Sequence, residues 1–333
     1  MTALPTRGVG STGVRVTALG FGGAGIGNLY RPVGDAQARA AVDAAWDDGF
    51  RYFDTAPHYG LGLSERRLGA ALAGRPRDAY VLSTKVGRLL VPNEHRTGSD
   101  MAHQFDVPDR LRRELDYSGP GVRRSIEESL ERLGADRVDV ALVHDPDDYV
   151  QEALDGALPE LIRMREEGLV RAVGVGMNQW QAPVRFVQEL DLDVVMLAGR
   201  WTLLDRTGAP LLQACADRGI SVLAAAPFNS GLLARPEPAE DSHFDYAPPD
   251  RALLDAAREL ARLASTHGVT LPQVALQFPL RHPAVAAVVV GLARPEHVDS
   301  AAGWLRQPVP EAFWDDAEAI VDGVLREGGA PHG

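Results

Sequence analysis

The chain is poor in cysteine, in basic charge and in long apolar runs. Cys215 is its one cysteine, so no disulfide can form within it. Lys and Arg total 34 against 46 Asp and Glu, and the net charge of −12 argues against a nucleic-acid partner, because such binding needs basic surface. No uncharged apolar run reaches the roughly 18 residues of a membrane helix, and no signal peptide is recognisable. We therefore expect a soluble, cytoplasmic protein without a membrane partner.

The sequence also lacks any linker or low-complexity segment that would divide its 333 residues. Its composition, 45% hydrophobic and 24% charged, is that of an ordinary globular protein. An α/β barrel often exceeds roughly 200 residues as one unit. We therefore expect a single domain over residues 1–333, with no need of a structural metal or disulfide. Its oligomeric state stays open.

A short apolar run, a turn and an amphipathic stretch alternate along the whole chain. This alternation predicts an α/β fold, either an open doubly wound sheet or a closed barrel. The expected strands are Thr17–Gly22, Phe50–Asp54, Ala79–Thr84, Val138–His144, Val170–Val175, Val194–Leu197, Ile220–Ala225 and Val285–Val290. The expected helices are Asp35–Asp48, Ser64–Ala73, Gly121–Leu133, Leu154–Glu167, Gln181–Leu190, Ala209–Arg218, Arg251–His267 and Pro295–Leu305.

Two long insertions and a glycine-rich start stand outside this alternation. We expect Arg88–Gly119, after the third strand, and Phe228–Asp250, after the seventh, to be long irregular loops. Both follow the carboxyl end of a strand, which is the face where barrel enzymes build their active sites. The segment Thr6–Val16 predicts a β-hairpin before the first barrel strand, placed to close a barrel from below.

Residues 20–25 (GFGGAG) match the G-x-G-x-x-G pattern of many dinucleotide-binding sites. That site needs a helix directly after the glycines, so that the pyrophosphate lies on the helix N-terminus. Here residues 27–32 intervene, and the next helical pattern starts near Asp35. We therefore favour a glycine-rich strand end that lets a ligand approach the backbone over a Rossmann unit.

Four ionisable side chains stand at or just beyond the ends of expected strands. Asp54 ends the second strand and Tyr59 follows it by five residues, while Lys85 follows the third strand and His144 ends the fourth. In a barrel the carboxyl ends of parallel strands meet at one mouth. We therefore expect these four side chains to lie close together if the sheet closes.

Such a group suits proton transfer to or from an oxygen whose carbon gains or loses hydride. A phenol with a pKa near ~10 is a poor base at neutral pH. An adjacent ammonium favours the phenolate, a carboxylate holds that ammonium, and an imidazole can orient the substrate oxygen. No serine or cysteine stands beside a base, and no close histidine–carboxylate cluster marks a metal site. Neither nucleophilic nor metal-dependent hydrolysis is therefore expected.

Residues 53–65 (FDTAPHYGLGLSE) strongly resemble the signature of the aldo-keto reductases, and residues 83–85 (STK) and 142–144 (LVH) match its next two blocks. The resemblance covers nearly the whole chain and implies a (β/α)8 barrel. It also implies that Tyr59 is the general acid/base, that Lys85 and Asp54 tune it, and that His144 positions the carbonyl or alcohol.

The resemblance further implies an extended nicotinamide dinucleotide across the barrel mouth. Asn178 corresponds to the asparagine that holds the nicotinamide carboxamide, although Met177 replaces the usual serine before it. Ala198 stands where the family has a glutamine, and residues 224–227 (AAAP) replace a stacking tyrosine. Further candidates for cofactor contacts are Gly22, Pro227, Asn229, Gly231, Leu232, Gly291, Arg294 and His297.

The preference between the two nicotinamide cofactors depends on the block after the last strand, residues 290–297 (VGLARPEH). Relatives that prefer NADP tend to carry a lysine and an arginine there, which clamp the 2′-phosphate. This chain has Gly291 and His297 at those positions, although Arg294 could partly substitute. NAD is the expected cofactor and NADP the alternative, and we hypothesise that the loop Phe228–Asp250 closes over it.

Residues 27–31, 198–205 and 227–233 resemble a branch of bacterial sugar dehydrogenases within the family. This resemblance implies NAD(P)-dependent oxidation of an aldose such as L-fucose at C1 to its lactone. A pyridoxal 4-dehydrogenase and an NADPH-dependent carbonyl reductase are alternative enzymes, and a cofactor-sensing channel subunit is a non-enzymatic one. Polar or aromatic candidates for sugar contacts are Asn28, Tyr30, His58 and Trp201.

Overall fold

A closed barrel of parallel strands forms the centre of the computed structural model, which describes residues 3–245 and 247–327. The strands follow one another round the barrel in chain order, and each pairs in parallel with its neighbours. The barrel confirms the expected (β/α)8 fold. Its strands are β3 (Leu19–Gly22), β4 (Tyr52–Asp54), β5 (Val81–Val86), β8 (Val140–His144), β9 (Ala172–Met177), β10 (Val194–Ala198), β11 (Ser221–Ala225) and β12 (Val285–Gly291).

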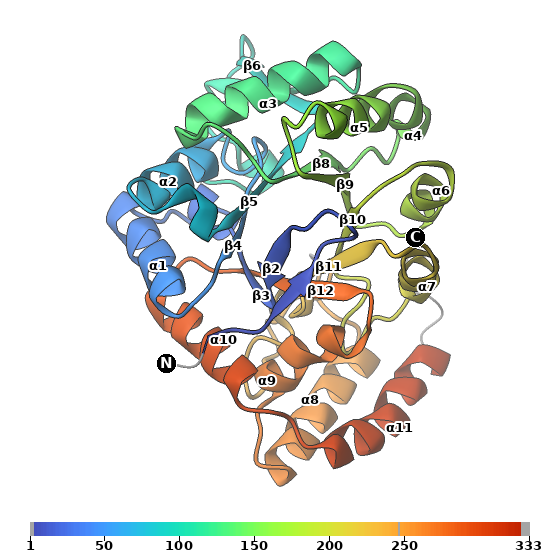
Figure 1. Cartoon of the computed structure of the whole chain (residues 1–333). Helices are drawn as coiled ribbons and strands as arrows, with labels where there is room; N and C mark the ends of the chain where they lie inside the picture. Colours follow the sequence, from blue (N-terminus) through green and yellow to red (C-terminus); the bar gives the residue numbers. More distant parts are fainter. Residues whose placement is uncertain (1–2, 246, 328–333) are drawn as a thin grey trace.

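Helices surround the barrel and bury one apolar face of each strand (Figure 1). Phe53, Leu82 and Val143 belong to this layer and are at most 1% exposed. The helices are α1 (Asp35–Asp47), α2 (Leu63–Leu72), α3 (Gly119–Leu133), α4 (Val150–Glu152), α5 (Leu158–Glu166), α6 (Gln181–Glu189), α7 (Ala209–Arg218), α8 (Arg251–Thr266), α9 (Leu271–Gln277), α10 (Pro295–Arg306) and α11 (Glu311–Glu327). Within the described ranges, none of them is long and apolar enough to cross a membrane.

Helix α3 illustrates how the sequence sets the ends of an element. Ser118 precedes the helix, and its side chain accepts a hydrogen bond from the backbone N–H of Gly121, which caps the first turn. The helix ends at Gly134, whose φ of 59° lies in the left-handed region that glycine adopts without strain. The apolar side chains between these ends repeat at helical spacing and face the barrel.

The N-terminal hairpin closes the amino end of the barrel. Its strands β1 (Thr6–Gly8) and β2 (Arg15–Thr17) pair antiparallel. Val9, Val14 and Val16 are fully buried and belong to the same core as the side chains that fill the barrel. The expected hairpin is confirmed, but Thr17 pairs with Thr6 and so belongs to the hairpin instead of the first barrel strand.

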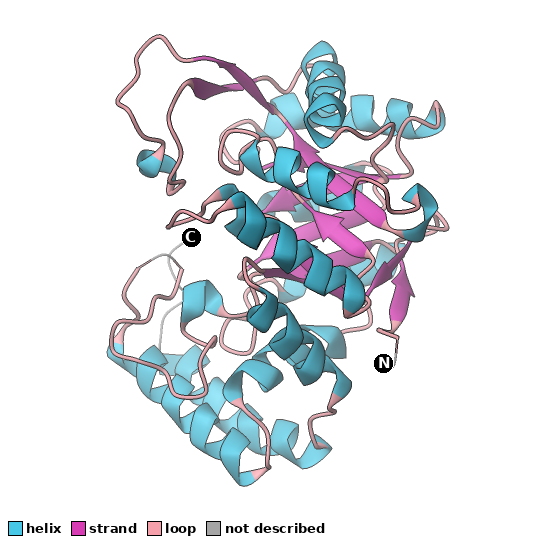
Figure 2. Cartoon of the chain, turned by 90° about the vertical axis from the view of Figure 1, so that its left-hand side faces the viewer, coloured by secondary structure: helices cyan, strands magenta, loops and turns pink. Residues whose placement is uncertain are grey.

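The insertion Arg88–Gly119 is not wholly irregular, and that part of the expectation is wrong. It contains a second antiparallel hairpin, β6 (Arg88–Pro92) with β7 (Leu111–Leu115). Figure 2 shows this hairpin projecting at the end of the molecule opposite the N-terminus. Most of β7 is exposed or half-buried. A ribbon in water needs no continuous apolar face, so the periodic pattern of a buried strand is absent.

Three helices lie outside the predicted set, the short α4 and the longer α9 and α11. Every residue of α9 except Gln277 is buried, so the helix has no polar face to mark it in the sequence. Helix α11 packs against α8, and together they bury a second core outside the barrel that includes Leu260 and Phe313. The long loop expected after the seventh strand is confirmed between β11 and α8, although its residue 246 lies outside the described residues.

We expect a methyl group at Gly174 to disrupt the barrel wall. Gly174 in β9 lies opposite Val194 in β10, and a Cβ there would be 1.6 Å from the Val194 carbonyl oxygen. Gly174→Ala should therefore lower the free energy of unfolding by about 3 kcal/mol or more, measured by chemical denaturation. The matched control is Gly303→Ala in α10, where a Cβ would meet nothing within 4 Å. That change should be neutral or stabilising by up to about 1 kcal/mol, and equal losses in both variants would contradict the prediction.

Candidate active site

A cavity of about 270 Å³ opens where the barrel strands end. Asp54 is the last residue of β4, Lys85 lies near the end of β5, His144 is the last residue of β8, and Tyr59 lies on the loop after β4. All four side chains line the cavity. The structure therefore brings together the four ionisable residues predicted from the strand ends.

A buried ion pair lies at the base of this group. The Lys85 Nζ atom is 2.7 Å from Asp54 Oδ2 and also donates to the Thr55 carbonyl oxygen at 3.0 Å. The Lys85 and Asp54 side chains are 2% and 3% exposed. The other Asp54 oxygen accepts a hydrogen bond from Ser83 Oγ at 2.7 Å, and Ser83 in turn contacts the Tyr52 hydroxyl at 3.0 Å. Both charges are thus fully hydrogen-bonded, as a buried pair must be.

This pair determines the charge beside Tyr59. Burial alone would lower the pKa of Lys85, but the charges of Asp54 and Tyr59 outweigh it and raise that pKa above its usual range. Lys85 Nζ lies 4.8 Å from the centre of the Tyr59 ring. Burial raises the pKa of Tyr59, while the charge of Lys85 and its hydrogen bond to the phenol oppose that rise. At neutral pH the site therefore holds a protonated phenol beside a permanent cation.

His144 is a neutral imidazole at the same site. Burial, and then the positive charges of Arg88 and Lys85, lower its pKa well below the usual value. Its ring stands edge-on to Tyr59, with the ring centres 5.9 Å apart and an interplanar angle of 89°. Among the described residues its buried Nδ1 has no hydrogen-bond partner. A neutral imidazole that lines the cavity is suited to hydrogen-bond a ligand.

The insertion after β5 contributes part of the cavity wall that sequence reasoning missed. His103, Gln104 and Phe105 line the cavity. Phe105 is 2% exposed and packs with Leu61 and Leu90 in a small core of its own. The one sequence signal for these residues is the position of the insertion at the carboxyl end of a strand.

Asp145, directly after β8, is a further missed residue of the wall. Burial raises its pKa to about 6, against the opposing charge of Arg88. Its carboxylate pairs with Arg88 Nη2 at 2.9 Å. Nothing in the sequence separates it from the neighbouring acidic residues of the same loop.

Of the predicted sugar contacts, His58 lines the cavity and Asn28 does not. The Asn28 side-chain oxygen accepts hydrogen bonds from the Val33 N–H at 3.0 Å and from Arg67 Nη1 at 2.7 Å. Its amide nitrogen donates to the Asp106 carbonyl at 3.0 Å. Asn28 therefore joins two loops and does not line the cavity, and its role as a sugar contact stays a prediction.

Trp201 and Tyr30 are also absent from the cavity lining. Trp201 packs outside the barrel against Phe278 and His282, with ring centres 5.4 Å and 5.5 Å away. Tyr30 is 52% exposed, and its backbone N–H donates to the Gln104 carbonyl at 2.7 Å. Neither residue lines the cavity, so their roles as sugar contacts stay predictions.

Three of the predicted cofactor residues, Gly22, Asn178 and Gly291, line the cavity. A Cβ at Gly22 would lie 3.0 Å from the Val290 carbonyl oxygen, so a side chain there would crowd the strand end. At Gly291 a Cβ would meet nothing within 4 Å, which leaves open space beside the backbone. Because Gly22 and Gly291 have no side chains, a ligand in the cavity can lie close to the backbone of these strand ends.

Asn229 lines a smaller hollow that adjoins the cavity and shares Asn178 with it. Its side-chain oxygen is buried and has no partner within the described part of the chain. Arg200 and Asp245 line the same hollow, and their ion pair of 2.8 Å ties the loop after β11 to the segment after β10. An unpartnered acceptor in a hollow continuous with the mouth fits the polar groups of a dinucleotide.

The remaining predicted cofactor residues do not line either hollow. Leu232 is fully buried, so its side chain packs in the core outside the barrel. The Arg294 side chain is 43% exposed and lies 3.7 Å from Glu296 at the start of α10. His297 lies in the first turn of that helix. The residues outside both linings are Pro227, Gly231, Leu232, Arg294 and His297.

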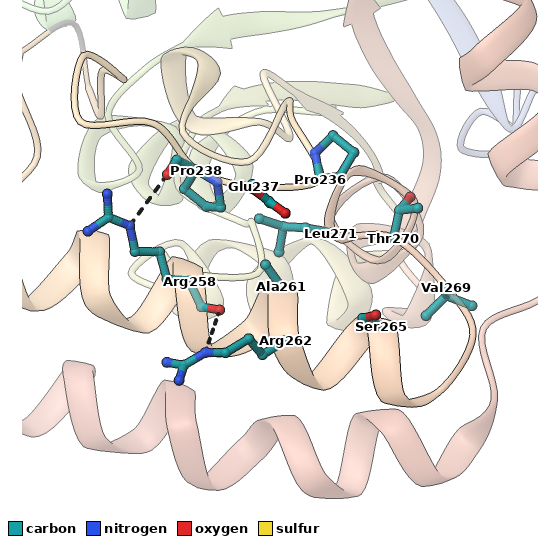
Figure 3. A pocket seen from close by; sticks show the side chains of 10 residues that line it. All are labelled: Pro236, Glu237, Pro238, Arg258, Ala261, Arg262, Ser265, Val269, Thr270 and Leu271. Atoms are coloured by element: carbon teal, nitrogen blue, oxygen red, sulfur yellow. Dashed lines mark hydrogen bonds between the residues drawn. The ribbon is translucent and has the colours of Figure 1, made fainter.

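A larger hollow of about 600 Å³ lies between the loop after β11 and helix α8 (Figure 3). Arg258 on its wall already binds Glu240 at 2.7 Å, and Arg262 donates to the Arg258 carbonyl at 3.3 Å. Among its lining residues there is no tyrosine, lysine or histidine. Across the described ranges, no group of three or more His, Cys, Asp or Glu residues could hold a metal ion. The four predicted catalytic residues line the cavity at the barrel mouth and not this hollow.

Comparison with known proteins agrees with this geometry. D-threo-aldose 1-dehydrogenase of Pseudomonas sp is 47% identical over 314 residues, which cover 93% of this chain and 95% of that protein. Pyridoxal 4-dehydrogenase of Microbacterium luteolum is 37% identical and covers 94% of this chain and 96% of that protein. L-Galactose dehydrogenase of Arabidopsis thaliana is 30% identical, with 90% and 87% covered.

Solved structures share the fold. The holo form of an aldo-keto reductase from Bacillus halodurans superimposes with a TM-score of 0.77 at 24% identity and covers 96% of each chain. A glycerol dehydrogenase from Gluconobacter oxydans gives a TM-score of 0.79 at 22% identity and covers 98% of each chain. The profile of the aldo/keto reductase family matches residues 18–322. The chain therefore belongs to the aldo-keto reductases, a family of oxidoreductases that use nicotinamide cofactors.

Proposed function

We propose that the protein is an NAD-dependent aldose 1-dehydrogenase, which oxidises a cyclic sugar such as L-fucose at C1 to its lactone. The observation that carries the proposal is Tyr59 beside the buried Lys85–Asp54 pair in the cavity at the barrel mouth. The relative that is 47% identical, a D-threo-aldose 1-dehydrogenase, supports the choice of an aldose.

In this mechanism the chain's own residues handle the proton and hold the substrate. The nicotinamide, when bound, supplies the acceptor for the hydride of C1. Tyr59, as a phenolate stabilised by Lys85, takes the proton of the anomeric hydroxyl. Neutral His144 hydrogen-bonds the same oxygen and keeps it within reach of Tyr59. As the C1–H and O1–H bonds break, the second C–O bond of the lactone carbonyl forms.

Cofactor binding in this proposal uses the strand ends and the loop after β11. Asn178 and the unpaired oxygen of Asn229 would bind polar groups of the dinucleotide, and the bare backbone at Gly22 lets it lie close. We assign NAD because Gly291 and His297 replace the two cations of a 2′-phosphate clamp. Closure of the loop over the cofactor stays a prediction, which hydrogen exchange with and without NAD+ would test.

Replacing Tyr59 by phenylalanine should remove the proton acceptor while leaving the cavity intact. For Tyr59→Phe we expect kcat for NAD+-dependent L-fucose oxidation to fall by about 10²–10⁴-fold, measured from NADH absorbance. NAD+ binding, followed by protein fluorescence, should change little. The control is Tyr149→Phe, a tyrosine 37% exposed at the surface, which should keep full activity. Undiminished oxidation by Tyr59→Phe would overturn the assignment of Tyr59.

The two directions of the reaction should depend on pH in opposite ways. Because burial raises the pKa of Tyr59, the phenolate needed for oxidation forms only as the pH rises, whereas the phenol needed for reduction is lost. The kcat/KM for aldose oxidation should therefore increase from about pH 6 to about pH 10, and that for aldehyde reduction should decrease over the same range. Parallel profiles in both directions would contradict this role of Tyr59.

Cofactor preference should shift when the missing cations are restored. The unmodified protein should have a higher kcat/KM for NAD+ than for NADP+. The double variant Gly291→Lys/His297→Arg should raise kcat/KM for NADP+ by about tenfold or more, because two cations then meet the 2′-phosphate. The control His95→Arg, at an exposed site in the insertion, should leave kcat/KM for NADP+ unchanged. A wild-type preference for NADP+ would contradict the assignment of NAD.

Pyridoxal is a second candidate substrate, because the relative that is 37% identical is a pyridoxal 4-dehydrogenase. Its oxidation needs the same proton acceptor and the same hydride acceptor. Initial rates with NAD+ and either L-fucose or pyridoxal distinguish the two. Reduction of simple aldehydes by NADPH with no sugar oxidation would instead favour a carbonyl reductase.

A further inference from the structure

Two arginines of the β6–β7 hairpin reach back to polar residues of the cavity wall. Arg88 is the first residue of β6 and Arg113 lies within β7. Arg113 Nε donates to His58 Nδ1, and Arg88 Nη2 donates to Asp145 Oδ2 at 2.9 Å. Both His58 and Asp145 line the cavity. The hairpin that projects beyond the barrel in Figure 2 is therefore connected to the cavity at two points.

Arg113 determines which nitrogen of His58 carries the proton. Two of its nitrogens bind the carboxylate oxygens of Asp100, each at 2.7 Å, and both side chains are only 5% exposed. Arg113 Nη2 also donates to the His58 carbonyl at 2.8 Å. Because a guanidinium nitrogen is always a donor, Nδ1 of His58 must accept, and the proton of the neutral ring lies on Nε2. Burial, and then the charge of Arg113, lower the pKa of His58 to about 2, so the ring stays neutral.

Asp145 supplies the complementary group. The backbone N–H of Asp145 donates to the Gly176 carbonyl at 3.0 Å, which anchors the residue directly after β8. Its Oδ2 binds Arg88 and lies 3.4 Å from His144 Nε2. Within the described part of the chain, its Oδ1 and the His58 Nε2 have no hydrogen-bond partner. The wall therefore presents one fixed donor and one acceptor near His144.

We propose that His58 and Asp145 recognise the hydroxyl groups next to the reacting carbon, and that Arg113 and Arg88 position them for it. A sugar hydroxyl can accept from His58 Nε2–H and donate to the Asp145 carboxylate. An aldehyde without hydroxyls leaves His58 Nε2 and Asp145 Oδ1 without these hydrogen bonds in a half-buried wall, which costs binding energy. The inference rests on the proposed aldose specificity and assigns it to these residues.

The test uses two aldehydes that differ in their hydroxyl groups. Glyceraldehyde and propanal share a three-carbon chain, and both are reduced at the same carbon by the mechanism proposed above. The measured quantity is the ratio of their kcat/KM values with NADH. It needs no aldose oxidation, so it stays informative if the proposed physiological substrate is wrong.

Asp145→Asn and His58→Leu should each lower this ratio by about 10–100-fold through a higher KM for glyceraldehyde. The kcat/KM for propanal should fall less, because propanal carries no hydroxyl group for either residue to bind. Matched controls are Asp148→Asn and His95→Leu, both at exposed sites, which should leave the ratio unchanged.

Arg113→Met tests the positioning role. It should lower the ratio with His58 still present, and Arg113→Lys should recover part of it because the lysine still donates a hydrogen bond. Denaturation curves of all variants separate this effect from loss of folding.

The outcomes distinguish the two proposals. In one outcome, the ratio falls in Asp145→Asn and His58→Leu although the wild type oxidises no aldose. That result would support recognition of hydroxyl groups by these residues and would overturn the proposed substrate. If the wild type oxidises aldoses and the ratio does not change in folded variants, the inference is overturned. An equal loss of activity towards both aldehydes also overturns it, because the residues then serve the reaction in general.

Discussion

The buried contact between Lys85 and Asp54 is the constraint on which the site depends. An ammonium and a carboxylate that are 2% and 3% exposed are tolerated only together, and removal of one partner from such a pair costs about 3–5 kcal/mol. The contact joins the ends of β4 and β5, which are neighbours in the barrel. It thereby places the loop that carries Tyr59 above a permanent cation. The position of the Tyr59 phenol thus depends on the ion pair, and the ion pair depends on the pairing of β4 with β5 in the barrel.

The two hairpins serve opposite ends of this arrangement. The N-terminal hairpin contributes Val9, Val14 and Val16 to the barrel interior and excludes water from its amino end. The β6–β7 hairpin lies at the carboxyl end and directs Arg88 and Arg113 inwards, towards the cavity wall. The first hairpin therefore closes the barrel, and the second positions side chains at its mouth. As proposed, the strand ends carry the chemistry, His58 and Asp145 after β4 and β8 bind the hydroxyl groups, and the second hairpin positions these two residues.

Sequence reasoning located the barrel strands because apolar runs bounded by turns persist in a buried parallel sheet. It placed β5 and β9 two residues early, at Ala79 and Val170 instead of Val81 and Ala172. Strand ends depend on pairing with neighbours, which a local pattern does not contain. Helix α9 was not predicted because its residues are apolar on nearly every side and give no amphipathic pattern. The β6–β7 hairpin was missed as well, because Leu89 and Leu90 are buried in succession and every residue of β7 is exposed or half-buried, so neither strand shows the alternation of a half-buried strand.

The sequence by itself determined the fold class and the meeting of Asp54, Tyr59, Lys85 and His144, because closure of a parallel barrel brings successive strand ends to one mouth. Tertiary structure decided which other polar side chains reach that mouth. Asp145 lines the cavity, whereas the candidates Asn28 and Trp201 are used by loop hydrogen bonds and outer packing. The reason is physical: a loop side chain takes its direction from distant partners, and those contacts exist only after the chain has folded.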